Sequence, residues 1–318
     1  MGIDRRRGRG IHRMTALTIT HELDREIVVR DGDVELFRYV YAPDNPQLES
    51  PRPYVFPIRT RRGLDVGLYR PHDHVWHKGL SWSLPVVNDE NFWGGPTYVR
   101  DTGYVQLDNN GTQGHRRFTQ LSRSEDRAVI EHELDWTTQS GEEYISETRR
   151  LTAAVTGDAS WTLTFETTLE NVSGAQIAIG SPTTRGRENA GYGGLFWRGL
   201  RSFTDGSLVT SDGVGTGNDV RGQRHEWMAF EGKQDHIDAT SLVLMLDDTQ
   251  NPHHPPQWFA RSEEFAALNP APFFSEEVVI PVGESATFRY GVGIADGTAS
   301  DAPALADLVR GVLARDGA

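Results

Sequence analysis

The densest group of side chains capable of chemistry lies in residues 70–82, RPHDHVWHKGLSW. His72, His74 and His77 occur there with one carboxylate, Asp73. An imidazole can act as general acid or base because its pKa lies near neutrality. Three neutral imidazoles could instead hold a divalent metal, Zn, Fe or Mn, with one position left open. The spacing leaves both uses open.

Local geometry separates these side chains. In an extended segment His72 and His74 share a face and Asp73 points the other way, while His77 follows after a bend. We expect His74 and His77 to be the catalytic pair in a pocket, with Asp73 beside the substrate. A loop rich in Trp and His that packs on itself is the alternative.

Residues 247–261 form a second group, rich in proline, which we expect to be an ordered loop. Asn251, Trp258 and Arg261 in this group suit the recognition of a sugar or a carboxylate. An indole stacks on the apolar face of a sugar, and a guanidinium offers a forked pair of donors. Trp82 is a second candidate for stacking. A rigid crossover around a buried Trp258 is the alternative.

Residues 185–198 form a third group, in which glycines permit close approach of the backbone to a ligand. Glu188 is the best isolated acid and is expected to be the carboxylate partner of the histidines. Arg198 follows Trp197 in an expected strand, and an inward guanidinium requires a partner or an anionic ligand. His115 is a further pocket candidate. A surface hairpin, and a structural role for His115, are the alternatives.

The elements that must position these residues are mostly strands. Apolar and polar side chains alternate through residues 130–136, 161–169 and 288–294, as in strands with one buried face. Turn residues separate further expected strands near 17–30, 33–41, 54–60, 115–122, 143–155, 225–231, 240–246 and 276–281. This pattern predicts an all-β fold, a large antiparallel two-sheet β-sandwich, as a single domain over residues 15–298.

One helix is expected, in residues 299–318. Apolar residues there follow helical spacing, Asp301 can cap the helix, and Pro303 suits its first turn. The apolar set is Leu305, Leu308, Val309, Val312 and Leu313. We expect the helix to pack on the outside of the sheets.

Composition narrows the function classes. The chain has 318 residues, a formal charge of −13 and no cysteine, which excludes disulfides, thiol nucleophiles and thiolate metal sites. The acidic charge argues against nucleic-acid binding. The sequence contains no run of about 18 apolar residues, which a membrane-spanning helix would need. Residues 1–14 read as a disordered basic leader, with Met14 as an alternative start, and the cytoplasm is the expected location. Oligomeric state is left open.

Several segments together resemble a bacterial family labelled "methane oxygenase PmoA", or PmoA-like. The most specific are Arg52-Pro-Tyr54 with Pro57, and Asp73-His74 followed by His77 and Trp82. The remaining segments that carry the resemblance are residues 88–93, 194–198, 251–261, 269–270 and 276–294.

The resemblance implies a β-sandwich similar to the galactose-mutarotase-like super-sandwich, and a role in sugar catabolism. It does not imply the membrane subunit that the label names, because that subunit spans the membrane several times. Mutarotases bind sugar in a cleft on one sheet and use His and a carboxylate as base and acid. The chain departs from the family pattern at His72 and at Lys78, where an Arg is usual.

Three functions follow as hypotheses. The first is an enzyme (an epimerase, lyase or hydrolase) acting on a sugar or sugar derivative, in which Arg198 and Arg261 orient substrate oxygens. The second is a carbohydrate-binding sandwich without catalysis. The third is a metal-dependent oxygenase, with His115 or Glu188 as a further ligand.

Overall fold

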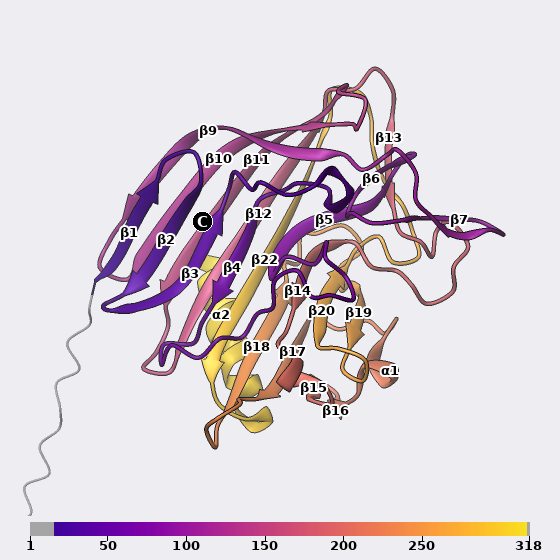
Figure 1. Cartoon of the computed structure of the whole chain (residues 1–318). Helices are drawn as coiled ribbons and strands as arrows, with labels where there is room; N and C mark the ends of the chain where they lie inside the picture. Colours follow the sequence, from indigo (N-terminus) through magenta and orange to yellow (C-terminus); the bar gives the residue numbers. More distant parts are fainter. Residues whose placement is uncertain (1–15, 317–318) are drawn as a thin grey trace, which may run out of the picture.

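The computed structural model describes residues 16–316, which form two large antiparallel sheets packed face to face (Figure 1). The longer path of the first sheet runs through β1 (Leu17–Glu22), β2 (Glu26–Asp31), β3 (Val34–Val40), β4 (Tyr54–Ile58), β5 (Leu80–Val87), β14 (Gly194–Arg198), β20 (Ala267–Ala271) and β19 (Gln257–Arg261). Beside β5 lie β6 (Glu90–Phe92), β13 (Ile177–Gly180) and β21 (Val278–Ile280).

The second sheet carries the longest strands. Its order is β16 (Gly213–Gly215), β15 (Ser207–Thr210), β17 (Trp227–Lys233), β18 (Thr240–Asp247), β22 (Ser285–Asp296), β12 (Ser160–Asn171), β11 (Glu143–Val155), β10 (Arg127–Thr137) and β9 (Thr112–Arg123). A separate hairpin, β7 (Thr97–Val99) and β8 (Gly103–Val105), projects from the body of the molecule (Figure 1). The predicted all-β two-sheet sandwich is confirmed.

The core lies between the two sheets and follows the alternation in the sequence. Every second residue of β10 is buried, including Ile130, Leu134 and Trp136, and these side chains belong to one cluster with residues of both sheets. Burial of one face of each strand removes apolar surface from water, which stabilises the fold by about 25 cal/mol per Å² of that surface.

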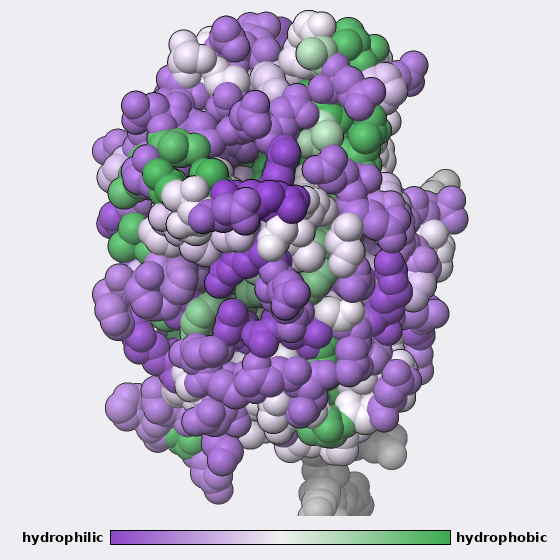
Figure 2. Space-filling model, turned by 90° about the vertical axis from the view of Figure 1, so that its right-hand side faces the viewer, coloured by the Kyte–Doolittle hydropathy of each residue, from purple (hydrophilic) through white to green (hydrophobic). Residues whose placement is uncertain are grey.

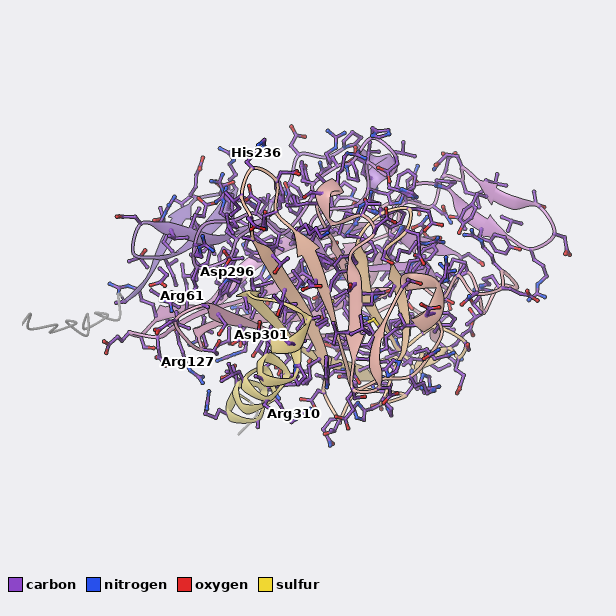
Figure 3. The ribbon with its side chains drawn as sticks, turned by 90° about the horizontal axis from the view of Figure 1, so that it is seen from below. Arg61, Arg127, His236, Asp296, Asp301 and Arg310 are labelled. Atoms are coloured by element: carbon purple, nitrogen blue, oxygen red, sulfur yellow. The ribbon has the colours of Figure 1, made fainter. Side chains whose placement is uncertain are left out.

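The predicted C-terminal helix is present as α2 (Ala302–Asp316), which lies across the outer face of the second sheet (Figure 3). Leu305 and Val309 pack on that face, and Gly293 of β22 allows the approach, since a Cβ there would lie 2.7 Å from Val309. Leu308 is exposed, contrary to its assignment to the apolar face. The Asp301 carboxylate accepts from the Thr298 backbone N–H at 2.8 Å, and so closes a capping box one turn earlier than expected.

The remaining elements are short. They are η1 (Gln47–Glu49), η2 (Arg201–Phe203), α1 (Gly217–Val220) and η3 (Ala299–Asp301). The predicted basic leader, residues 1–14, lies outside the described residues. Among the helices formed by residues 16–316, none is long and apolar enough to cross a membrane.

Candidate functional site

A pocket of about 710 Å³ opens on the outer face of the first sheet, away from the core between the sheets. Figure 2 shows the side of the molecule that carries the β7–β8 hairpin, where hydrophilic side chains surround smaller apolar patches. The pocket is lined by His72, Asp73, His74, Trp76, His77, Trp93, Gly94, Pro96, Tyr104, Arg187, Tyr192, Phe196, Arg201, Phe259, Arg261, Glu264 and Phe265.

Strand alternation decides which side chains reach this face. In β14, Trp197 belongs to the core between the sheets, whereas Phe196 faces the pocket. Arg198 has the same parity as Phe196 and lies directly behind the pocket wall, 1% exposed. In β19, Phe259 and Arg261 line the pocket by the same rule.

Buried charges anchor the histidine segment to the sheet. Glu49 of η1 pairs with Lys78, which is fully buried, and accepts from Arg70 Nε at 3.0 Å. Arg52 donates to the Trp76 carbonyl at 2.6 Å and to the Glu49 carbonyl at 2.9 Å. Burial lowers the pKa of Lys78 to about 8, although the Glu49 carboxylate opposes this effect. The network fixes both ends of the turn that presents His74 and His77.

Asp73 and Arg198 link the two predicted catalytic histidines. Asp73 Oδ2 accepts from His74 Nδ1 at 2.9 Å and from Arg198 Nη2 at 2.8 Å. The same guanidinium places Nη1 at 3.0 Å from His77 Nδ1. The result is a continuous chain of hydrogen bonds from His74 to His77.

The guanidinium fixes the tautomer of His77. Arginine has donors only, so His77 Nδ1 must be the acceptor, and the neutral ring carries its proton on Nε2. Burial lowers the pKa of His77 well below its ordinary value, and the charges of His74 and Arg198 lower it further. His77 is therefore a neutral N–H donor at physiological pH.

The carboxylate fixes the opposite tautomer in His74. Burial raises the pKa of Asp73, but hydrogen bonds from His74 and Arg198 outweigh that effect and hold it well below its ordinary value. The ionised carboxylate has no proton to donate, so His74 Nδ1 is the donor and the neutral ring keeps a lone pair on Nε2. The rings of His74 and His77 stack at 4.6 Å with an interplanar angle of 7°.

Aromatic side chains surround this pair. Trp93 meets His77 edge to face at 5.7 Å, and Tyr192 packs on Trp93 at 4.7 Å. Gly94 and Gly95 have positive φ, and a Cβ on Gly95 would lie 2.8 Å from the Trp76 indole. The two glycines therefore let the Trp76 ring settle against the backbone as part of the pocket wall.

Several residues expected at the site lie elsewhere. Trp82 and Trp258 are fully buried in the core between the sheets, and neither reaches the pocket. Their strand parity explains this: Trp258 and Arg261 are three residues apart, so they occupy opposite faces of β19. The aromatic rings at the pocket come instead from Trp76, Trp93, Tyr104, Tyr192, Phe196, Phe259 and Phe265.

Glu188, His115 and Asn251 also lie outside the pocket lining. Glu188 is exposed on a loop, and the carboxylates at the pocket are those of Asp73 and Glu264. His115 lies on β9, where its Nδ1 is 2.8 Å from His132 Nδ1. Asn251 is buried and donates to Asp247 at 2.7 Å, which orders the proline-rich loop.

The three imidazoles do not converge as a metal site. Among residues 16–316, no group of three or more His, Asp or Glu side chains has the geometry to hold a metal ion. His72 Nδ1 accepts from Arg201 Nη2 at 2.7 Å, and His77 Nδ1 faces the Arg198 guanidinium. The predicted ligand set of His72, His74 and His77 is therefore not formed.

The remaining pocket residues were missed because the sequence carries only a weak signal for them. Phe265 packs under the Arg198 guanidinium, 3.9 Å from ring centroid to Cζ, and comes from a loop with no recognisable motif. Trp93 stands in the Asn-Phe-Trp segment of the family resemblance, which was the one available indication.

The fold and the pocket define an antiparallel β-sandwich protein with a pocket on the outer face of one sheet. The chain belongs to the family described as "Family of unknown function (DUF6807)", whose pattern matches residues 26–310. No curated protein matches the chain.

Two solved structures are similar over most of this chain. The galactose 1-epimerase from Lactobacillus acidophilus NCFM has 9% identity and a TM-score of 0.39, and covers 89% of this chain and 98% of its own. The GalM/aldose epimerase homologue from C. elegans has 8% identity and a TM-score of 0.33, and covers 89% of this chain and 99% of its own. Both similarities concern strand arrangement, and the chemistry in those names belongs to those two proteins.

Proposed function

We propose that this protein is an enzyme that transfers protons on a sugar or sugar derivative bound in the outer-face pocket. The observation that carries the proposal is the stacked pair of imidazoles, His74 and His77, held in opposite tautomers by Asp73 and Arg198. One ring offers a basic nitrogen and the other an N–H, side by side at the same wall of the pocket.

The two rings take complementary roles. His74 Nε2 removes a proton from a carbon next to a carbonyl, and the imidazolium that forms is stabilised by Asp73. His77 Nε2–H donates to the carbonyl oxygen as negative charge develops there. Return of the proton to the other face of the carbon gives an epimer, and loss of a neighbouring substituent gives an unsaturated product. Both steps are those of an epimerase or a lyase.

The aromatic lining supports a carbohydrate as the substrate. Seven aromatic side chains face the pocket, and sugars present apolar C–H faces that stack on such rings. The same lining supports the second candidate, a carbohydrate-binding protein without catalysis. The resemblance to the PmoA-like family remains a prediction, since the matched family has no described function.

Proton exchange tests the proposal directly. We expect the wild-type protein to exchange a carbon-bound proton of at least one sugar for deuterium in D₂O, followed by NMR across a panel of aldoses, ketoses and sugar acids. His74→Gln and His77→Gln should each reduce the rate by roughly 10²-fold or more. Full exchange in both variants would refute the assignment. Binding of a sugar without exchange in the wild type would establish the second candidate instead.

The control is His236→Asn. His236 is exposed in the loop between β17 and β18, distant in the chain from the pocket segments, and is labelled in Figure 3. Its φ of 69° suits asparagine, which tolerates the left-handed region. This variant should exchange protons at the wild-type rate.

A further inference from the structure

We infer that the pocket selects an acidic sugar, a uronate whose carboxylate binds Arg187 at the end of the pocket away from the histidines. The inference rests on the proposed function for the reaction and adds the substrate class. The net charge of the side chains that line the pocket differs in sign from that of the whole chain. The chain has a formal charge of −13, yet the lining holds three arginines, Arg187, Arg201 and Arg261, against two carboxylates.

Two of those arginines already have carboxylate partners in the protein. Arg261 Nη1 lies 2.8 Å from Glu264, and Arg201 lies 3.6 Å from Asp73 while donating to His72. Asp73 is in addition paired with the buried Arg198 behind the wall. Arg198 and Arg201 share Asp73, and Arg261 pairs with Glu264, so each of these three guanidinium groups has a carboxylate partner within the protein.

Arg187 differs from the other two. Its guanidinium donates to the Tyr104 hydroxyl and lies 4.7 Å from the centre of that ring. Within residues 16–316, no carboxylate lies in ion-pair distance of Arg187, and that single hydrogen bond uses one of its five N–H donors. A half-buried guanidinium with an open fork is a receptor for a carboxylate, which it binds through two parallel hydrogen bonds.

The position of Arg187 selects where the carboxylate stands on the sugar. The hydroxyl of Tyr104, which Arg187 contacts, shares a hydrogen bond of 2.7 Å with the hydroxyl of Tyr192. Tyr192 packs on Trp93, and Trp93 packs on His77. Three aromatic rings thus separate the cation from the reactive imidazole. A sugar lying along these rings would react at its carbonyl end and place its acid group at the far end. A uronate has this arrangement, because its carboxylate is C6 and its carbonyl is C1.

The number of free cations distinguishes a carboxylate from a phosphate. One open guanidinium matches a single negative charge. A sugar 6-phosphate carries nearly two charges at pH 7 and would call for a second cation, whereas the other guanidinium groups at the pocket already pair with carboxylates of the protein.

Calorimetric titration of the full-length protein with D-glucuronate, D-galacturonate, D-glucose, D-galactose and D-glucose 6-phosphate tests the inference. At least one uronate should bind roughly tenfold or more tightly than its neutral counterpart and than the phosphate. Arg187→Gln should remove that preference, so that the uronate and its neutral counterpart bind with equal affinity. Arg310→Gln, on the exposed side of α2 (Figure 3), should keep the preference.

Equal affinity for neutral sugar and uronate, tighter binding of the phosphate, binding of no uronate, or a preference that survives in Arg187→Gln would each overturn the inference. The failure of the proposed function has a different signature. His74→Gln should keep the preference for the uronate over the neutral sugar and should lose the exchange of its proton. Retained exchange in His74→Gln would refute the proton-transfer assignment and leave the binding of the uronate by Arg187 standing.

Discussion

Arg198 Nη1 lies 3.0 Å from His77 Nδ1, and the arginine is 1% exposed. The two residues are 121 positions apart in the chain and meet behind the wall of the pocket. Since a guanidinium only donates, this contact fixes the orientation and the tautomer of the His77 ring. Arg198 is therefore a positioning residue, and the protonation of His77 depends on it.

Replacing Arg198 with lysine should disturb that protonation. Lysine keeps the charge but lacks the planar fork that reaches Asp73 and His77 together. We expect the ring of His77 to populate both neutral tautomers, and turnover to fall by roughly tenfold or more. Nitrogen chemical shifts of the histidine rings report the tautomer. If His77 in Arg198→Lys keeps the proton on Nε2 alone, the positioning role is wrong.

Asp73→Asn removes the negative charge of this residue and keeps its size and shape. The amide has nearly the same size but can donate as well as accept, so it no longer fixes His74 as the donor at Nδ1. Loss of the tautomer and of the stabilising charge should lower kcat by roughly 10³-fold, with a smaller change in KM. His236→Asn serves again as the control. A kcat within twofold of the wild type would contradict the role given to Asp73.

Glu49→Gln should loosen the anchor of the histidine turn. The substitution leaves the buried Lys78 ammonium without a carboxylate, and breaking a buried pair in this way costs about 3 kcal/mol or more of unfolding free energy. The matched control is Glu22→Gln, which removes an exposed pair with Arg25 and should cost less than about 1 kcal/mol. Urea denaturation measures both, and equal stability of the two variants would show that the buried Glu49 pair contributes no more than an exposed pair.

Stability should depend on pH through His132. Burial lowers the pKa of His132 well below its ordinary value, and nearby Arg149 and His115 lower it further. Between the folded pKa and the unfolded value of about 6.5, the unfolded chain binds a proton that the folded chain does not. The stabilisation is thus complete above pH 6.5 and is lost as the pH falls below it, by up to about 1.4 kcal/mol per pH unit for one group.

His132→Gln should flatten that dependence. Unfolding free energies at pH 7.5, 6.5 and 5.5 should fall less steeply in this variant than in the wild type, whereas His236→Asn should follow the wild type. Asp247, whose pKa burial raises to about 6, titrates in the same range but is the same in both proteins, so the difference between their slopes reports His132. An unchanged slope in His132→Gln would mean that this ring is not held neutral in the folded state.

The sequence alone predicted most of the long strands and the C-terminal helix, and it singled out residues 72–77, five of which line the pocket. The prediction of a loop over residues 247–261 is wrong at its end, where Gln257–Arg261 forms β19. Alternation of apolar and polar residues follows from the geometry of a single strand, and helical spacing from that of a single helix, so both can be read locally. The same rule could have placed Phe259 with Arg261 and excluded Trp258, because residues two apart share a face of a strand.

Only the tertiary structure decided which of the two faces carries the pocket. Trp82 and Trp258 are of a residue type common in sugar-binding sites, yet they face the second sheet and belong to the core between the sheets. Glu188 was expected as the carboxylate partner of the histidines, whereas the carboxylate that contacts His74 is Asp73, which is also bound by Arg198, 125 residues away. Pairing of distant strands brings those side chains together, and no local pattern encodes it. Local spacing therefore determined the elements and the reactive residue types, and the packing of the two sheets decided which of those residues share a pocket.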